Sequence, residues 1–314
     1  MIYTEMKGRI GNQLFRYAIS RKIQEDRNNI DNLIFSFNSM KGKSADDGWE
    51  NSLKYFNVKK YSLYNGKGHM IMHVSNFKQR IIATAFYIDL RLFNHNDRKI
   101  RNEVMYKWEN ILLKNDLIIM GEKYYPIDKR FQSNKIFIDG SFQNEKYFEE
   151  IKDMLQEELT PIEKPLEKNK RLYEIINNSN SVCVSIRRGD YISNPLYNKE
   201  YNICNVDYFK NAVKKINTIV KNPVYVIFSD DIKWAKNNIN FGDKTYYESG
   251  EDPIWEKLRL MYSCKHFIIS NSSFSWWAQY LCRNKHKIVV SPDRWYKQDY
   301  PSYLINDSWI KIEI

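Results

Sequence analysis

Long apolar runs are missing from this sequence. No stretch of about 18 consecutive apolar residues could cross a bilayer as a helix. The N-terminus, M-I-Y-T-E-M-K-G, also lacks the apolar core of a signal peptide. We therefore expect a cytoplasmic protein, and peripheral docking on the inner face of the membrane stays open beside that expectation.

Cysteine is scarce, and its spacing is not that of common zinc or redox sites. None of the four cysteines lies in a C-x-x-C pair. In a cytoplasmic chain such residues are expected to be reduced thiols of the core, not disulfides or metal ligands. They are Cys183, Cys204, Cys264 and Cys282.

The well-known nucleotide and metal motifs are missing as well. The sequence contains neither the G-x-G-x-x-G pattern of dinucleotide-binding folds nor the G-K-[ST] of a P-loop. No D-x-D cluster suited to a Mg²⁺–diphosphate complex stands out, because Asp46-Asp47 lies in a polar loop and Asp230-Asp231 at a predicted helix start. We expect no metal site.

Basic residues are in excess, with 49 Lys and Arg against 38 Asp and Glu and a net charge of +11. This balance suits an anionic ligand, an anionic membrane surface or nucleic acid. Basic clusters with interleaved aromatics in an RNA-binding pattern are absent from the sequence. Nucleic acid is therefore the least favoured of the three partners, and we expect none.

The length predicts two domains, because 314 residues exceed what one hydrophobic core usually holds. The segment Thr160–Lys170 has two prolines and many charges, which is typical of a linker. We place the boundary there and expect domains at residues 1–160 and 161–314.

The first domain begins with a recognisable unit. A strand over Met1–Glu5 leads through a turn with Gly8 and Gly11 into a helix over Asn12–Asp26. This arrangement often binds anions, because the first N–H groups of a helix have no intrahelical partner. A plain tight turn is the alternative.

The rest of the first domain has weaker secondary-structure patterns. We expect strands over Asp31–Phe37 and Lys135–Asp139, a helix over Phe77–Phe93, and helical structure over Trp108–Leu113. Three histidines of this region have no partner at metal-ligand spacing, so we interpret each as structural or solvated: His69, His73 and His95.

The second domain alternates short β-branched runs with amphipathic segments. This pattern predicts an α/β domain with a doubly wound parallel sheet. The expected strands are 182–186, 224–228, 245–247, 266–269 and 287–290, and the expected helices are 206–220, 231–239, 253–264 and 274–282.

Polar residues follow every one of these predicted strands. Ligands of such sheets bind beyond the carboxyl ends of the strands, so the joint pattern indicates a nucleotide pocket. The strand ends read R-R-G-D (187–190), S-D-D (229–231), E-S-G-E-D (248–252), S-N-S-S (270–273) and S-P-D-R-W (291–295).

Arg187 and Arg188 are the most suggestive of these residues. Two adjacent guanidinium groups are costly to crowd together unless an anion lies between them, and a guanidinium fork binds phosphate oxygens. Gly189 lets the backbone turn sharply there. The alternative is that both arginines are solvated or pair with Asp190.

Two other strand ends allow both a functional and a structural interpretation. Asp230 could accept hydrogen bonds from the adjacent N–H donors of guanine, or it could cap the following helix, and Asp231 has the same two alternatives. In the segment Ser270–Ser273, capping explains one side chain. The remaining hydroxyls and helix N–H groups could hold phosphate oxygens.

Four blocks of the sequence resemble glycosyltransferase family 11, the bacterial α-1,2-fucosyltransferases. The blocks are G-R-I-G-N-Q-L-F-R-Y-A (8–18), V-S-I-R-R-G-D-Y (184–191), F-S-D-D-I-K-W-A (228–235) and H-F-I-I-S-N-S-S-F-S-W-W-A (266–278). Together they cover both predicted domains in the expected order.

The resemblance implies a GT-B-like fold in which two Rossmann-type domains face a cleft. It implies inverting transfer of L-fucose from GDP-β-L-fucose without a metal or another cofactor. The implied acceptor is the 2-hydroxyl of a terminal β-galactoside in a galactose-containing glycan, with a lipid-linked O-antigen precursor as one form. The first domain would then serve the acceptor and the second the donor.

The resemblance also assigns residues. The H-x-R-R-x-D motif of the family falls on Ser185, Arg187, Arg188 and Asp190, and the last three are the implied catalytic residues. The implied donor-binding residues are Gly8, Gly11, Asn12, Ser185, Arg187, Asp230, Asn271, Ser272, Ser273, Phe274 and Ser275.

Two positions depart from the family pattern. Ser185 replaces the motif histidine, and Arg9 replaces the usual second glycine of the first block. Alternatives to the implied function are an α-1,6 or α-1,3 linkage, another GDP-sugar, or a non-catalytic nucleotide- or glycan-binding module. The general base stays open among Glu5, Asp190 and Glu248.

Overall fold

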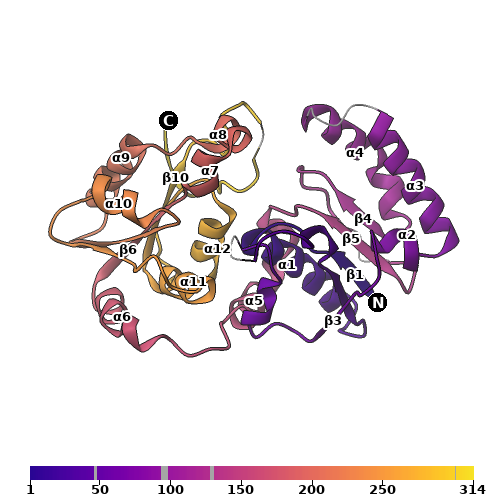
Figure 1. The fold of residues 1–314 in the computed structure, drawn as a ribbon, viewed down its shortest axis with the longest axis horizontal. Helices are drawn as coiled ribbons and strands as arrows, with labels where there is room; N and C mark the ends of the chain where they lie inside the picture. Colours follow the sequence, from indigo (N-terminus) through magenta and orange to yellow (C-terminus); the bar gives the residue numbers. More distant parts are fainter. Residues whose placement is uncertain (46–47, 93–97, 128–130, 301) are drawn as a thin grey trace. The chain divides into compact units, whose positions relative to one another are not determined.

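The computed structural model describes residues 1–45, 48–92, 98–127, 131–300 and 302–314. His95 and the Asp46-Asp47 pair lie outside these ranges. The chain forms two compact units (Figure 1). Unit 1 contains Met1–Lys54 and Val58–Leu155, and unit 2 contains Tyr55–Asn57 and Gln156–Ile314. The structure thus divides the chain after Leu155, whereas the sequence placed the division after residue 160.

Unit 1 is built on a five-stranded parallel sheet with the strand order β3-β2-β1-β5-β4. Its strands are β1 (Ile2–Glu5), β2 (Leu33–Ser36), β3 (Tyr61–Leu63), β4 (Leu117–Met120) and β5 (Ile136–Gly140). Its helices are α1 (Ile10–Asp26), α2 (Met70–Val74), α3 (Phe77–Leu92), α4 (Arg98–Leu113) and α5 (Lys152–Glu158), the last of which crosses the boundary.

Alternation along β1 separates the two faces of this sheet, as the two-residue period of a strand requires. Tyr3 packs in a cluster with side chains of α2, α3 and α4, among them Phe86 of α3. The next residue, Thr4, faces α1, where its hydroxyl lies 2.7 Å from that of Ser20. Helices therefore cover both faces.

Unit 2 is built on a six-stranded parallel sheet with the order β11-β10-β9-β6-β7-β8. The strands are β6 (Asn180–Ile186), β7 (Pro223–Ser229), β8 (Thr245–Tyr247), β9 (His266–Ile269), β10 (Val289–Pro292) and β11 (Ile310–Ile312). The helices are α6 (Lys170–Asn177), α7 (Gly189–Ser193), α8 (Pro195–Tyr201), α9 (Val206–Asn217), α10 (Ile232–Asn238), α11 (Ile254–Ser263) and α12 (Ser273–Leu281).

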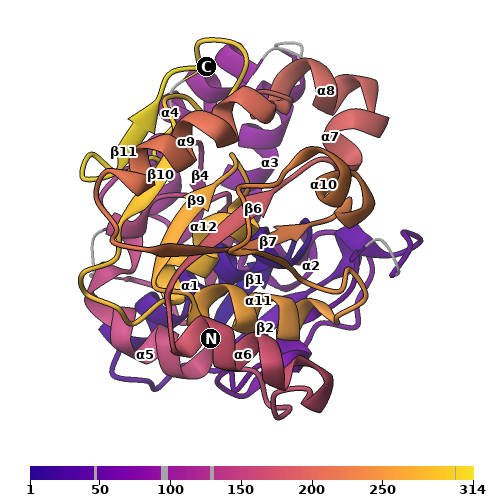
Figure 2. The same cartoon turned by 90° about the vertical axis from the view of Figure 1, so that its left-hand side faces the viewer.

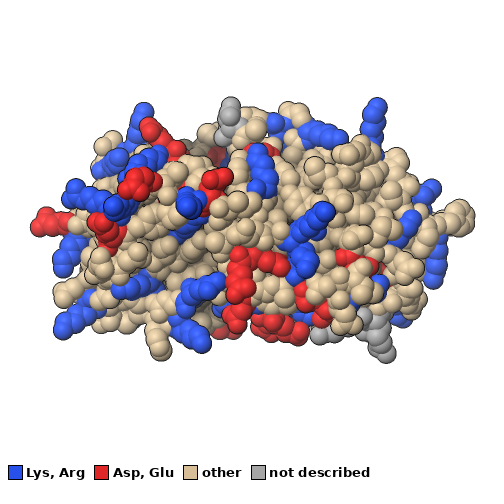
Figure 3. Space-filling model, turned by 90° about the horizontal axis from the view of Figure 1, so that it is seen from below, with Lys and Arg blue, Asp and Glu red and all other residues tan. Residues whose placement is uncertain are grey.

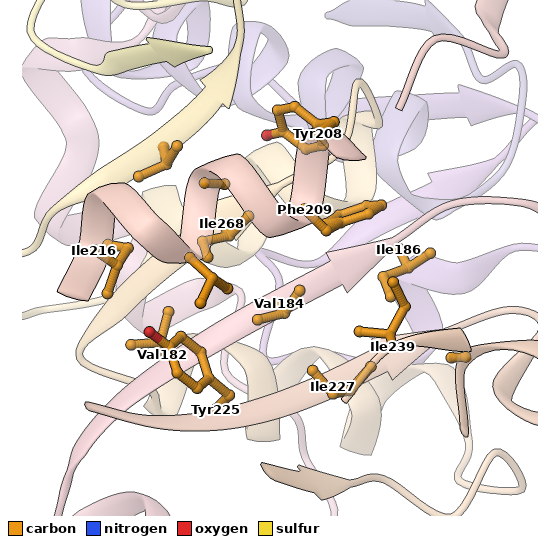
Figure 4. Packing of buried hydrophobic residues seen from close by; sticks show 14 of the residues in the cluster. Val182, Val184, Ile186, Tyr208, Phe209, Ile216, Tyr225, Ile227, Ile239 and Ile268 are labelled. Carbon is orange, nitrogen blue, oxygen red and sulfur yellow. The ribbon is translucent and has the colours of Figure 1, made fainter. Parts of the chain in front are cut away.

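The core of unit 2 lies between its sheet and α9 with α10. Val182, Val184 and Ile186 of β6 pack there against Phe209 and Ile216 of α9 (Figure 4). Residues between them point to the other face, which α11 and α12 cover (Figure 2). The alternating β-branched run that predicted a buried strand is therefore buried on both of its faces.

The expected elements of unit 2 are all present within a few residues, and the fold class of two Rossmann-type α/β domains is confirmed. The sequence missed α6, α7, α8 and β11 there, and α2, β3, β4 and most of α4 in unit 1. One expectation needs correction: α1 begins at Ile10, not at Asn12, so Gly11 and Asn12 belong to its first turn.

The remaining ordered segments are short 3₁₀ turns: Asn38–Met40, Ser52–Tyr55, Glu145–Tyr147, Glu149–Ile151 and Glu167–Asn169. The four cysteines are free, and all but the half-buried Cys204 are buried, as expected of core thiols. Among the helices in the described ranges, none is both long and apolar enough to cross a membrane.

Candidate functional site

Strand β6 lies between β9 and β7 in the sheet of unit 2. Because all three strands are parallel, their carboxyl ends meet at one edge. The predicted groups R-R-G-D, S-D-D and S-N-S-S therefore lie side by side there. The structure brings together the residues that the sequence singled out in this unit.

Arg187 is held between two carboxylates at this edge. Its Nη2 lies 2.6 Å from Asp190 Oδ1 and its Nη1 lies 2.7 Å from Asp230 Oδ2. The ring of Tyr191 lies beside the guanidinium, 5.5 Å from its centre. Burial alone would lower the pKa of Arg187, but the charges of Asp230 and Asp190 raise it above its ordinary value. This pairing with Asp190 is the structural alternative that the sequence left open.

Arg188 points elsewhere. Its guanidinium stacks over the ring of Trp234 at 3.7 Å, and its Nε lies 3.5 Å from Asp231 Oδ2. Its backbone N–H donates to Asp230 Oδ1 at 2.8 Å. The two arginines therefore have different surroundings, although they are adjacent in the sequence.

Gly189 makes the approach of Asp230 to this turn sterically allowed. A Cβ atom at position 189 would lie 2.6 Å from Asp230 Oδ2, which is closer than real Cβ contacts. The helix after β7 is capped by the neighbouring residue, because Asp231 Oδ1 accepts from the N–H of Trp234 at 3.1 Å. Asp230 is thus not the cap, and its carboxylate joins the ends of β6 and β7.

The start of α12 borders the same edge. Ser272 occupies the N-cap position, and its side chain makes no capping hydrogen bond. Ser273 and Phe274 follow in the first turn and are half-buried. The first amides of a helix have no intrahelical acceptor, so this turn can offer N–H groups to an anion.

Three other residues of the predicted set have internal partners. The hydroxyls of Ser185 and Ser275 lie 2.7 Å apart, and both residues are buried. Asn271 is also buried, and its amide donates to the carbonyl oxygens of Tyr201 and Trp295 at 2.9 and 2.8 Å. These side chains tie the ends of β6 and β9 to their neighbours, and their predicted contact with a donor stays a prediction.

The predicted turn before α1 is present at Gly8, whereas Gly11 lies in the helix. Gly8 has φ +78°, and a Cβ there would lie 2.6 Å from the side-chain nitrogen of Asn12. Asn12 also accepts from Gln143 at 3.0 Å. Arg9, which replaces a family glycine, is the N-cap residue of α1, and its guanidinium lies 5.8 Å from the ring of Trp49.

A buried charged cluster in unit 1 was not foreseen. Asp139, near the end of β5, accepts from Lys7 Nζ at 2.6 Å and from Arg16 Nη1 at 2.9 Å. His69 Nε2 lies 3.1 Å from the same carboxylate. Burial alone would raise the pKa of Asp139, but the hydrogen bond of His69 and the charge of Lys7 hold it well below its ordinary value.

The cluster continues to Glu5, the last residue of β1. Its Oε1 accepts from the N–H of Met70 at 2.7 Å and lies 3.4 Å from His69 Nδ1. His69 therefore has polar partners, which agrees with its interpretation as a structural residue. Glu5 and Asp139 are the last residues of two predicted strands, and the carboxyl ends of parallel strands meet at one edge of a sheet. This signal in the sequence could have placed them together.

The other two base candidates are neutralised by cations. Glu248 is buried, and its Oε1 lies 3.0 Å from Lys257 Nζ, while Asp190 pairs with Arg187. Among the described residues, no group of three or more His, Cys, Asp and Glu side chains could hold a metal ion.

The fold and this edge of unit 2 define a class of protein. Two Rossmann-type units with parallel sheets, one of them with arginines and a helix start at its carboxyl edge, are the architecture of GT-B-like glycosyltransferases. Residues 1–313 match the family described as glycosyl transferase family 11. The chain belongs to this family.

Two curated relatives and one solved structure illustrate the similarity. The O-antigen biosynthesis glycosyltransferase WbnK of Escherichia coli is 27% identical over 99% of this chain and 100% of its own length. An alpha-1,2-colitosyltransferase of Escherichia coli is 32% identical over 67% of this chain and 79% of its own length. The crystal structure of NodZ alpha-1,6-fucosyltransferase soaked with GDP-fucose has a TM-score of 0.52 at 12% identity, covering 93% of this chain and 94% of that one. This last likeness shows the fold alone.

Proposed function

We propose that the protein transfers L-fucose from GDP-β-L-fucose to the 2-hydroxyl of a terminal β-galactoside with inversion. Membership of family 11 gives the reaction class. The observation that carries the proposal is the position of Arg187 at the end of β6, beside the first turn of α12. An arginine and a helix start at one sheet edge suit the diphosphate of a nucleotide sugar.

The reaction is a single in-line displacement. The bond from the anomeric carbon to the β-phosphate oxygen breaks, the bond to the acceptor oxygen forms, and the acceptor hydroxyl loses its proton to a base. Negative charge develops on the departing GDP. A charge-assisted hydrogen bond contributes roughly 1.5–3 kcal/mol, so two such contacts with the helix amides could supply about 3–6 kcal/mol.

Because these contacts can stabilise the departing GDP, we propose that the transfer needs no metal ion. Arg187 is already positioned by Asp190 and Asp230, so its guanidinium needs little reorganisation to meet a phosphate. The guanine is proposed to lie near Asp230, whose carboxylate keeps acceptor capacity beyond its two present partners.

Of the three base candidates, we propose Glu5. Asp190 and Glu248 each lie within salt-bridge distance of an arginine or lysine. Glu5 instead lies beside His69, whose side chain is 26% exposed and can exchange protons with solvent or substrate. We therefore propose that Glu5 and His69 together receive the acceptor proton.

The test is a transfer assay with the purified full chain and a chelator. GDP-fucose and GDP-colitose are each offered with a panel of β-galactosides, and the linkage of every product is determined. An α-1,2-fucosylated galactoside formed in the presence of chelator is the expected result. Products with an α-1,6 or α-1,3 linkage would contradict the proposed linkage. Products formed from GDP-colitose but not from GDP-fucose would contradict the proposed donor. Donor binding by calorimetry without turnover on any acceptor would indicate a non-catalytic module.

A further inference from the structure

Helix α3 has two apolar faces, although only one of them is needed for packing. The inner face carries Ala83 and Phe86, which are buried against the sheet of unit 1. The outer face carries four large apolar side chains spaced by four or seven residues, which an α-helix places on one side. We call these four residues the α3 stripe: Phe77, Ile81, Ile88 and Leu92.

The α3 stripe is strongly exposed. Phe77 and Leu92 are 80% and 75% exposed, and Ile81 and Ile88 are 52% and 53% exposed. Among the described residues, six of the fifteen large exposed apolar side chains lie on the 32 residues of α3 and α4. Single exposed apolar residues are ordinary, but a gathering of this kind marks an interaction surface.

The charges beside the α3 stripe are of one sign. The exposed charged residues of α3 are Lys78, Arg80 and Arg91. The helix has one acid, Asp89, which is half-buried and accepts from the indole N–H of Trp108 of α4 at 2.6 Å. Figure 3 shows one face of the molecule, on which Lys and Arg side chains, with some Asp and Glu, are spread over a largely uncharged surface.

Helix α4, which packs beside α3, extends this character. Its clearly exposed charged side chains are Lys99, Arg101, Glu103 and Lys107, three of them basic. Its other acidic residue, Glu109, is buried. The two helices therefore present apolar side chains within a positively charged surround.

We propose that the α3 stripe docks the protein on an anionic bilayer surface. An interfacial helix combines an apolar face that enters the headgroup region with Lys and Arg that meet anionic lipids. The stripe spans about 22 Å along the helix at 1.5 Å per residue, so all four side chains can enter one interface. A second copy of the chain fits less well, because a symmetric contact would bring Lys78, Arg80 and Arg91 of both copies together.

The test is cosedimentation of the full chain with vesicles. One set contains phosphatidylcholine alone, and the other contains about 30% phosphatidylglycerol. We expect at least about tenfold stronger binding to the anionic vesicles, and a marked loss of this difference at high salt. The proposal does not depend on the transfer reaction, so failure to bind vesicles would leave the proposed function untouched.

Two double variants examine the surface itself. Ile81→Gln with Ile88→Gln removes apolar contact, and Lys78→Glu with Arg91→Glu reverses two charges. Each is expected to weaken binding to anionic vesicles by about tenfold or more. The matched controls in unit 2 are Ile162→Gln with Ile219→Gln, which are 57% and 49% exposed, and Lys210→Glu with Lys214→Glu on α9.

Circular dichroism first establishes that all variants are folded, which exposed substitutions should leave unchanged. The proposal is overturned if the wild-type chain does not bind anionic vesicles more strongly than neutral ones. It is also overturned if the control variants lose as much binding as the stripe variants. A dimer that dissociates on Ile81→Gln with Ile88→Gln in sedimentation would also overturn it, because the stripe would then be a contact between copies.

Discussion

Arg187 Nη1, just after the end of β6, lies 2.7 Å from Asp230 Oδ2, just after the end of β7. Gly189 leaves room for the Asp230 carboxylate there. The arginine proposed to meet the diphosphate and the aspartate proposed to meet the guanine are thus in direct contact. A substitution of either residue is therefore expected to alter the position of the other side chain.

We expect Asp230→Asn to abolish the preference for GDP over ADP. A carboxylate offers about four lone-pair sites, of which Arg187 and the amide of Arg188 use two, so the adjacent N–H donors of guanine can use the rest. Calorimetry with GDP and ADP measures the ratio. If both nucleotides bind more weakly by the same factor, Asp230 acts only by holding Arg187.

Both arginines should contribute to transfer, Arg187 more than Arg188. Arg187→Ala is expected to lower kcat/KM by about a hundredfold or more, the scale of losing one preorganised donor. Arg188→Ala should cost less, because the guanidinium of Arg188 stacks over Trp234. Arg187→Lys keeps the charge but loses the fork, so it should recover only part of the rate. Arg171→Ala, at an exposed position of α6, is the control. Near-normal turnover in both alanine variants would refute the mechanism.

The strands that carry this edge were predictable from local sequence. Val182, Val184 and Ile186 alternate, and their strand stops at charged residues, which is the signature of a buried strand with a functional end. The short strand β4 was missed although all its residues are buried and Asn115-Asp116 form a turn before it. Four apolar residues alone do not distinguish a strand from a helix.

The ion pairs were harder to foresee than the strands. The sequence placed Arg187 at a strand end, but its pairing with Asp230 depends on how β7 lies beside β6. The contact of Lys7 with Asp139 joins residues 132 positions apart. Such contacts come from sheet order, which α/β alternation predicts only in part.

Ser185 explains how the protein tolerates the loss of the family histidine. Its hydroxyl and that of Ser275 satisfy each other in a buried position. Ser185→Ala should lower stability by about 1 kcal/mol, the contribution of one hydrogen bond. Ser185→His should cost about 1–3 kcal/mol, because an imidazole overpacks the site. Denaturant unfolding measures both, and a more stable histidine variant would contradict this account.

Asp139→Asn should strongly destabilise unit 1. It leaves Lys7 and Arg16 without their shared carboxylate, and breaking a buried pair costs about 3–5 kcal/mol. Because folding lowers the pKa of Asp139, its stabilisation is present above the ordinary value of 3.8 and is lost as the pH falls further.

Hydrogen exchange in β1 and β5, followed from pH 7 to about pH 3, reports on unit 1 separately from unit 2. The control is Asp153→Asn at an exposed position of α5. Equal protection in the two variants at pH 7 would show that the cluster does not hold the unit together.

Glu109 should make unit 1 less stable at alkaline pH. Burial raises the pKa of Glu109 to about 7 from its ordinary value of 4.5, and the charge of Lys123 offsets only part of this. The folded state therefore keeps a proton that the unfolded chain releases, so stability falls as the pH rises from 4.5 to about 7 and stays lower above it. Glu109→Gln cannot ionise and should raise the stability of unit 1 at pH 8 by about 1–3 kcal/mol. Glu103→Gln on the same helix is exposed and should change little. The stability of the Glu109→Gln variant is compared with that of the wild type between pH 5 and pH 7. If it falls as steeply, another group causes the pH dependence of stability.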